Sequence, residues 1–431
     1  MLSGQMLSAR LATLQRRLDA GDDGAVEEFW RDVAVEGTPL IESIPGDHNH
    51  VLVTFLWREG CSPCEQVPLR TVVVLSKFNG FGDFHRHQME RLSGTDVWHR
   101  SCRVRTDVRT SYYLSPSDAL LSFFDSDRER WVEKFGALCR QQVIVPDPLN
   151  RHPFPESGPP NTSCVTLPDA ASQPWLAVRE GVPAGQVAHH RFRSGVLDNE
   201  RDVWLYTPHG FAPSREPYPL LVVFDGKSYV EWMAAPTTLD NLIAAGMVPP
   251  MVAAFVGNVR RAHELAGSPA FVDFLTEELV PWVRVQASAT SDPARTVIAG
   301  SSMGGLAASF AALRRPDVFG NVLSQSGAFK WKSAGEWKSA GESEWEWLIH
   351  EFERTPRLPL RFWLDVGEFE TVPQFGPTPE QDGPTLLATN RHLRDVLRAK
   401  GYDVRYTEFA GSHDYIWWRG TLANGLMTLL G

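Results

Sequence analysis

The sequence predicts a mixed α/β protein in which a β-sandwich precedes a mostly parallel sheet covered by helices. Between about residues 30 and 145, apolar residues recur at every second position in short runs separated by turn signals, without a long intervening helix. This pattern is typical of strands packed as a sandwich. From about residue 186, short apolar strands alternate with amphipathic helices, which is typical of a parallel sheet with helices on both faces.

The 431 residues are enough for two domains, and we expect the first over residues 1–150. It begins with a helix, because Leu11, Leu14 and Leu18 recur at helical spacing. Residues 151–185 are rich in proline and show no periodicity, so we expect a linker there. The strands of the first domain are expected at 51–57, 71–78 and 96–108.

The second domain is expected over residues 186–431. Apolar residues at helical spacing predict two of its helices, one around Phe274 and one around Leu393. The six-residue unit WKSAGE is written twice at 331–342 and is expected to extend a surface loop. The strands of the second domain are expected at 202–208, 219–226, 251–258, 295–300, 320–326, 360–367 and 403–411.

The composition excludes some classes of protein and indicates a compartment. A formal net charge of −10 argues against a general nucleic-acid binder, and no apolar run approaches the roughly 18 residues of a membrane span. The N-terminal stretch lacks the apolar core of a secretory signal, and five cysteines fit a reducing compartment, so we expect a cytoplasmic protein. Cys61 and Cys64 form a C-x-x-C pair without the further ligands of a structural zinc, so no metal site is expected.

A candidate nucleophile lies in the segment TVIAGSSMGG, where Gly300-Ser301-Ser302-Met303-Gly304 fits G-x-S-x-G with Ser302 at its centre. A predicted strand runs into this motif and an alanine-rich helix follows it, which is the strand–turn–helix context of a serine nucleophile. The glycines allow the tight turn, and the N–H of Met303 then points to where an oxyanion would form. Ser301 is expected to be a packing residue.

A serine hydroxyl needs a base to remove its proton, and the base needs an acid to orient it. The predicted base is His413, in the loop after the last predicted strand. The acid is expected after the preceding strand, where Glu370 is favoured over Glu368, and Asp365 is expected to point into the packing. The second oxyanion donor is predicted to be the backbone N–H of Lys227, although an ordinary β-turn would explain the same segment.

With these residues in place, the chain resembles the bacterial enterochelin esterases. Segments that carry the resemblance are RLSGTDVWHRSCRVRTDVRTSYYLSP in the first half, and VVFDGKSY, RRAHELAGSPAFVDFLTEELVPWV and GSHDYIWWRGTLANGL in the second. The resemblance implies an immunoglobulin-like N-terminal domain and a C-terminal α/β-hydrolase domain. It also implies a cytoplasmic enzyme that opens ferric catecholate siderophores, with Ser302 as nucleophile, His413 as base and Glu370 as acid.

The expected reaction is hydrolysis of the ester bonds of a tri-serine lactone scaffold. The resemblance implies that Arg261 lies beside the substrate, and that iron belongs to the substrate while the protein needs no cofactor. For Trp331 and Trp418 two roles stay open, packing on a catechol ring or ordinary burial. The N-terminal sandwich is expected to cover the active site and to contribute substrate contacts around Trp98.

Two other functions stay open. One is a related serine esterase or acyltransferase acting on feruloyl, acetyl or sugar esters, because fold and triad do not choose the substrate. The other is a non-catalytic protein that binds the siderophore. The expected partner is the siderophore, with no nucleic acid and no membrane, and the sequence predicts no oligomeric state.

Overall fold

The computed structural model of the chain describes residues 8–61, 69–76, 84–122, 131–155, 162–213, 216–332, 345–371 and 383–431. Cys64 and residues 333–342 of the doubled WKSAGE segment lie outside these ranges. The chain divides into two compact units: of the described residues, the first contains those up to Ala171 and also Ala410–Ser412, and the second contains the others from Ser172 onward. Among the described residues, no helix combines the length and the apolar character needed to cross a membrane.

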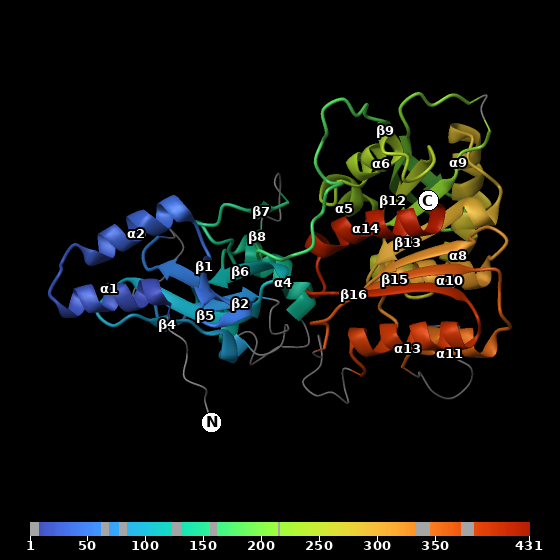
Figure 1. The fold of residues 1–431 in the computed structure, drawn as a ribbon. Helices are drawn as coiled ribbons and strands as arrows, with labels where there is room; N and C mark the ends of the chain where they lie inside the picture. The colour runs from blue at the N-terminus through green and yellow to red at the C-terminus, as the bar shows by residue number, and fades with distance from the viewer. Residues whose placement is uncertain are drawn as a thin grey trace. The chain divides into compact units, whose positions relative to one another are not determined.

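The first unit is built on two four-stranded antiparallel sheets, ordered β1-β2-β5-β4 and β3-β6-β8-β7 (Figure 1). Phe55 on β2 and Tyr112 on β6 join the two sheets, with ring centroids 4.8 Å apart, so their inward-facing side chains build one core. The strands are β1 (Leu40–Ile44), β2 (Asp47–Arg58), β3 (Val73–Ser76), β4 (Glu90–Arg91), β5 (Val97–Arg105), β6 (Arg109–Ser115), β7 (Pro153–Phe154) and β8 (Thr162–Thr166). The helices are α1 (Ala9–Asp19), α2 (Ala25–Glu36), η2 (Phe84–His87) and α4 (Trp131–Arg140).

Two details of the first unit differ from expectation. β7 and β8 lie inside the stretch 151–185 that was expected to be a linker, and both belong to the second sheet. β7 is a two-residue edge strand that starts with Pro153, and a piece this short leaves no periodicity in the sequence. Trp98, expected to face a ligand, lies on β5 with 6% of its surface exposed, so it packs in the interior instead.

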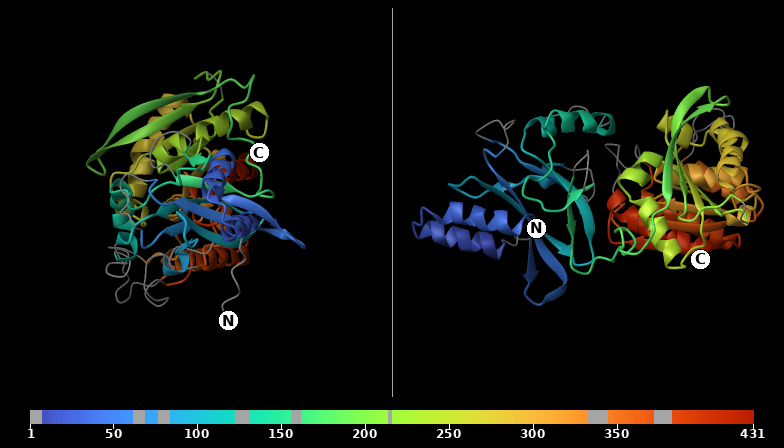
Figure 2. Two further views of the ribbon diagram at one scale, coloured as in Figure 1. Left: turned by 90° about the vertical axis from the view of Figure 1, so that its left-hand side faces the viewer. Right: turned by 90° about the horizontal axis from the view of Figure 1, so that it is seen from above.

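The second unit contains an eight-stranded sheet ordered β16-β15-β14-β13-β11-β12-β10-β9. The strands from β11 to β16 run parallel, whereas β9 and β10 form an antiparallel hairpin at one edge (Figure 2). Every residue of β11 and β12 is buried, which explains why both strands appear in the sequence as unbroken apolar runs. The strands are β9 (Gln186–Ser194), β10 (Asn199–Thr207), β11 (Leu220–Phe224), β12 (Val252–Val256), β13 (Thr296–Ser301), β14 (Asn321–Gln325), β15 (Arg361–Gly367) and β16 (Asp403–Phe409).

Helices cover both faces of this sheet. α13 packs on β15 and β16 and against α11, whereas α14 packs on β14 and β15 from the other face and against α6 (Figure 1). This mostly parallel sheet between helical layers, preceded by a β-sandwich, confirms the expected fold class. The helices are α5 (Gly226–Glu231), α6 (Ala235–Ala244), α7 (Arg261–Leu265), α8 (Pro269–Asp273), η4 (Phe274–Leu279), α9 (Val280–Ala287), η5 (Pro293–Arg295), α10 (Met303–Arg314), α11 (Trp347–Arg354), α13 (Leu386–Ala399) and α14 (Tyr415–Leu430).

Candidate active site

The parallel strands end at one edge of the large sheet, and the segments after them carry the predicted site residues. Ser302 directly follows β13, while Glu370 and His413 follow β15 and β16. Lys227 and Arg261 follow β11 and β12 on the other side of β13. In open α/β sheets, ligands bind outside the carboxyl ends of the strands. The sheet therefore brings residues that are far apart in the sequence to the edge where a site is expected.

Ser302 occupies a strained turn between β13 and α10. Its φ of 58° and ψ of −120° lie where residues other than glycine are seldom found. The turn needs glycine at position 300, because a Cβ there would lie 2.6 Å from the carbonyl carbon of Gly304. The Ser302 N–H donates to the carbonyl oxygen of Gln325 on β14 at 2.9 Å, which fixes the turn to the sheet. This is the geometry that the G-x-S-x-G motif predicts for a nucleophile.

Met303 and Lys227 carry the backbone N–H groups that were predicted to face an oxyanion. Each stands in the first turn of a helix, α10 and α5 respectively, where N–H groups have no acceptor within the helix. A short helix, α5, thus follows β11, whereas the alternative was an ordinary β-turn. Asp225, with a φ of 55°, makes the turn from β11 into α5. The Lys227 ammonium group is 3.9 Å from Glu231 on a side chain that is 65% exposed, so it belongs to the surface.

Glu370 and His413 form the central polar pair of this edge. The Nδ1 atom of His413 lies 2.7 Å from Oε2 of Glu370, whose side chain is fully buried. The other carboxylate oxygen, Oε1, accepts hydrogen bonds from the backbone N–H of Gly367 at 2.8 Å and from the hydroxyl of Ser326 at 2.6 Å. Three donors thus compensate for the burial of this charge.

This pairing settles which atom of the imidazole carries a proton. A carboxylate only accepts hydrogen bonds, so Nδ1 of His413 donates to Glu370 and the neutral ring keeps a lone pair on Nε2. Nε2 is the atom that can take a proton from a nucleophile. Of the two acids considered, Glu370 is the one placed against the imidazole at 2.7 Å. The backbone N–H of Glu368 donates to the carbonyl oxygen of Phe409, continuing the pairing of β15 with β16.

The two tryptophans proposed to pack on substrate are placed differently. Trp418, in the first turn of α14, is only 3% exposed, and its Nε1–H donates to the Ser326 hydroxyl at 3.0 Å. Its ring meets the His413 ring edge to face, with centroids 4.7 Å apart. Of the two roles left open for Trp418, packing on a catechol ring or ordinary burial, the structure shows burial. Trp418 therefore offers no ring face to a substrate. Trp331 is partly buried against the core, and its contact with a substrate ring stays a prediction.

Arg261, expected beside the substrate, is already paired with Asp225. Its Nε and Nη2 atoms contact the two carboxylate oxygens of Asp225 at 2.6 and 2.8 Å, and Asn258 donates to the same carboxylate. Asp225 is 7% exposed, whereas the Arg261 side chain is 39% exposed. The guanidinium therefore holds the turn that leads into α5, and direct contact with substrate stays a prediction.

Ser326 also belongs to this site, although no motif in the sequence marks it. Ser326 follows β14 directly, as Ser302 follows β13, so the predicted strands already placed Ser326 at the carboxyl edge of the sheet.

Asp365 was expected to point into the packing, and its side chain is indeed fully buried on β15. Burial raises the pKa of Asp365 from 3.8 to about 7, opposed by the hydrogen bond from Trp363 and reinforced by the charge of Glu370.

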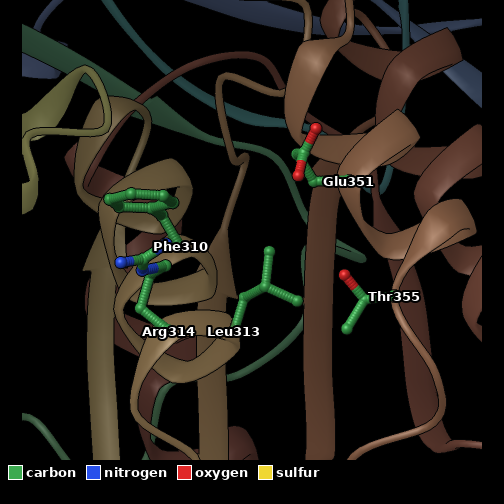
Figure 3. A pocket seen from close by; sticks show the side chains of 5 residues that line it. All are labelled: Phe310, Leu313, Arg314, Glu351 and Thr355. Atoms are coloured by element: carbon green, nitrogen blue, oxygen red, sulfur yellow. The ribbon is translucent and has the colours of Figure 1, made fainter. Parts of the chain in front are cut away.

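Among the described residues, no group of three or more His, Cys, Asp or Glu side chains is arranged to hold a metal ion. A surface pocket of about 200 Å³ lies between α10 and α11 (Figure 3). Its lining residues on α10 fall roughly 10–17 Å along the helix from Met303, at about 1.5 Å per residue, so the pocket is remote from Ser302. The pocket is lined by Phe310, Leu313, Arg314, Glu351 and Thr355.

Comparison with known proteins assigns the chain to a family. The family model of putative esterases matches residues 194–429, and that of the enterochelin esterase N-terminal domain matches residues 52–176. The iron(III) enterobactin esterase of Dickeya dadantii is 33% identical, over 98% of this chain and 96% of its own length. That of Escherichia coli K12 is 30% identical, over 88% and 90% of the two chains.

Solved structures agree with this assignment over nearly the whole chain. The ferric enterobactin esterase of Salmonella typhimurium superposes with a TM-score of 0.73 at 29% identity, covering 94% of this chain and 98% of that one. The enterobactin esterase of Shigella flexneri, in the presence of enterobactin, gives 0.71 at 27% identity, covering 94% and 97%. The resemblance drawn from the sequence motifs is thereby confirmed: the chain belongs to the enterochelin esterase family of carboxylic ester hydrolases.

Proposed function

We propose that this enzyme hydrolyses the ester bonds of the tri-serine lactone scaffold of a ferric catecholate siderophore of the enterobactin type. The observation that carries the proposal is the full-length similarity to iron(III) enterobactin esterases, at 33% identity in the case of Dickeya dadantii. The buried pair of Glu370 and His413 at 2.7 Å, at the same sheet edge as Ser302, supplies the chemistry that such a reaction needs.

The proposed first step is attack of the Ser302 hydroxyl on an ester carbonyl carbon. Nε2 of His413 takes the hydroxyl proton while Glu370 holds Nδ1 and stabilises the imidazolium. The oxyanion that forms accepts hydrogen bonds from the N–H groups of Met303 and Lys227, and loss of one such donor typically lowers turnover by about 10²–10³. The tetrahedral intermediate collapses as the ester C–O bond breaks, and His413 gives its proton to the departing serine hydroxyl of the scaffold.

The second step releases the acyl group by the same route. His413 takes a proton from water, the resulting hydroxide attacks the acyl carbon, and Ser302 leaves with the proton from His413. Opening the scaffold separates catecholates that were linked, which lowers their effective concentration around iron and weakens its binding. Every proton transfer in this scheme uses a side chain, so we propose that the protein needs no cofactor and that iron enters as part of the substrate.

The alternative functions have weaker support. Five relatives that align with about two thirds or more of this chain are named iron(III) enterobactin or salmochelin esterases, and a match to the enterochelin esterase N-terminal domain accompanies the catalytic unit. A non-catalytic siderophore-binding protein would have no need of the strained Ser302 turn or of an oriented carboxylate–imidazole pair. The proposed compartment is the cytoplasm, because a long chain with five cysteines fits a reducing compartment better than a disulfide framework.

Mass spectrometry of the products tests the proposal. The enzyme is incubated with iron-loaded and iron-free cyclic triester, a glucosylated triester and a feruloyl ester. We expect ring-opened triester and smaller serine catecholates, and turnover of the feruloyl ester alone would show that the siderophore assignment is wrong. Turnover of the iron-free triester should persist with EDTA, since no step of the scheme uses a protein-bound metal.

Two adjacent serines supply the matched variants. Ser302→Ala should lower kcat on the order of 10⁶-fold, as loss of a serine nucleophile does. Ser301→Ala should keep activity close to that of the wild type, because Ser301 is 1% exposed and ends β13 as a packing residue. Full activity in Ser302→Ala would contradict the mechanism.

A further inference from the structure

We infer that Ser326 and Trp418 are positioning residues that lock the Glu370–His413 pair in the orientation needed for hydrolysis. The inference rests on the roles proposed above for Glu370 and His413 and adds two residues to them. Neither side chain needs to touch a substrate: Ser326 is 0% exposed and Trp418 is 3% exposed. Their effect would reach the reaction through the carboxylate and the imidazole that they contact.

The four side chains form a closed ring of contacts. Glu370 contacts His413 at 2.7 Å and the Ser326 hydroxyl at 2.6 Å. The Ser326 hydroxyl oxygen in turn accepts a hydrogen bond from the indole N–H of Trp418 at 3.0 Å, and the indole and imidazole rings pack edge to face at a centroid distance of 4.7 Å and an interplanar angle of 89°. A closed ring restricts rotation of each member more than an open chain does, because moving one side chain breaks two contacts.

The direction of each hydrogen bond in this ring is fixed by chemistry. An indole N–H can only donate and an ionised carboxylate can only accept. The Ser326 hydroxyl must therefore accept from Trp418 and direct its own proton to Oε1 of Glu370. With Oε1 also taken by the Gly367 N–H at 2.8 Å, Oε2 is the oxygen left for Nδ1 of His413. Ser326 thus helps to decide which carboxylate oxygen faces the imidazole.

The backbone of Ser326 carries a strain that fits this role. Its φ is 47°, a left-handed value that costs energy for any residue with a Cβ. The conformation lets its N–H donate to the carbonyl oxygen of Asp365 at 2.7 Å while its hydroxyl reaches Glu370. A residue needed only for the turn would be glycine or asparagine, which adopt this conformation at lower cost. The hydrogen bond from its hydroxyl to Glu370 explains why serine occupies this position.

Kinetics of three variants on a neutral p-nitrophenyl ester test the inference without involving the siderophore. Ser326→Ala removes one of the two donors to Oε1, and we expect kcat to fall about 10–100-fold with KM little changed, because the lost bond is to a charged group. Trp418→Phe keeps a ring beside His413 but removes the N–H, and kcat should fall about 3–10-fold. Ser324→Ala is the matched control, since Ser324 is equally buried on β14 and its hydroxyl has no hydrogen-bond partner; its kcat should be unchanged.

A spectroscopic readout separates positioning from a general loss of folding. The downfield ¹H resonance of His413 Nδ1–H, observed with ¹⁵N-labelled histidine, should shift or broaden in Ser326→Ala and stay unchanged in Ser324→Ala.

The outcomes distinguish this inference from the proposed function. Wild-type kcat and an unchanged Nδ1–H resonance in Ser326→Ala would overturn the inference, while an inactive Ser302→Ala would leave the mechanism standing. An active Ser302→Ala would instead overturn the mechanism itself. If Ser326→Ala does not fold, Trp418→Phe decides, because it keeps the Ser326 backbone and hydroxyl; an unchanged kcat and resonance in that variant would also refute the inference.

Discussion

Replacement of the buried Asp365 by asparagine should remove a large part of the pH dependence of stability in the second unit. Asp365 is 0% exposed, and its Oδ2 accepts a hydrogen bond from the indole of Trp363 at 3.0 Å. Its other oxygen, Oδ1, is buried without a hydrogen-bond partner. Burial raises the pKa of this carboxyl to about 7, so the native protein keeps it protonated in conditions where the unfolded chain does not.

The size and sign of the effect follow from proton linkage. A shift from 3.8 to about 7 corresponds to about 4 kcal/mol, at 1.36 kcal/mol per pKa unit. Because the native state binds the extra proton, the carboxyl lowers the free energy of unfolding as pH rises from about 4 to 7, and the full loss applies above 7. Asp365→Asn has no carboxyl to ionise, so its stability should exceed that of the wild type by up to about 4 kcal/mol at pH 8 and match it near pH 4.

Urea unfolding at several pH values between 4 and 8.5, followed by near-UV circular dichroism, measures this difference. Asp273→Asn, which changes an exposed aspartate of the same unit, is the matched control and should keep the wild-type pH dependence. Parallel pH curves for the wild type and Asp365→Asn would refute the reasoning, because they would show that Asp365 is ionised in the folded state at no cost.

Two further substitutions test local packing and pairing. Gly305→Ala would place a Cβ about 2.3 Å from the Ser324 hydroxyl oxygen, so it should lower the free energy of unfolding by about 1–3 kcal/mol in urea titrations; an unchanged midpoint would show that the turn has room to relax. Arg261→Met leaves the Asp225 carboxylate without its two guanidinium contacts and should destabilise by about 1–3 kcal/mol, discounted because Arg261 is 39% exposed. Adding Asp225→Asn should recover most of that loss, and no recovery in the double variant would contradict the pairing.

Features of the site that are local in the sequence could be predicted. The strand, the glycines and the helix around Ser302 lie within the continuous segment from Thr296 to Arg314, so the motif contains its own structural context. Glu370 and His413 could be chosen because each follows a strand of a parallel sheet, whose carboxyl ends must meet at one edge. Strand order and chain direction were enough to bring these residues to one edge, although spacing alone did not separate Glu370 from Glu368.

Features that depend on side-chain partners far along the chain could not be predicted. Trp418 stands five positions after His413, and nothing local shows that its indole turns inward to a serine 92 residues earlier. Nothing in the local sequence shows that Arg261 is paired, because Asp225, which accepts from two of its three donor nitrogens, lies 36 residues earlier. The short strand β7 was not predicted, because its two residues, one of them proline, give no periodic pattern in the sequence.

The placement of His413 shows why buried polar side chains matter more than the apolar core at this site. His413 lies in a loop, and loops are the least constrained part of a fold unless both ends are fixed. β16 fixes the loop on one side, and α14 begins two residues after the imidazole on the other. Gln325, at the end of β14, donates to the Trp418 carbonyl oxygen at 2.7 Å and to the Thr421 hydroxyl at 2.6 Å, which ties the start of α14 to the sheet. Apolar contacts alone would let this helix slide along the sheet, whereas directed hydrogen bonds fix the start of α14 and with it the loop that carries the imidazole.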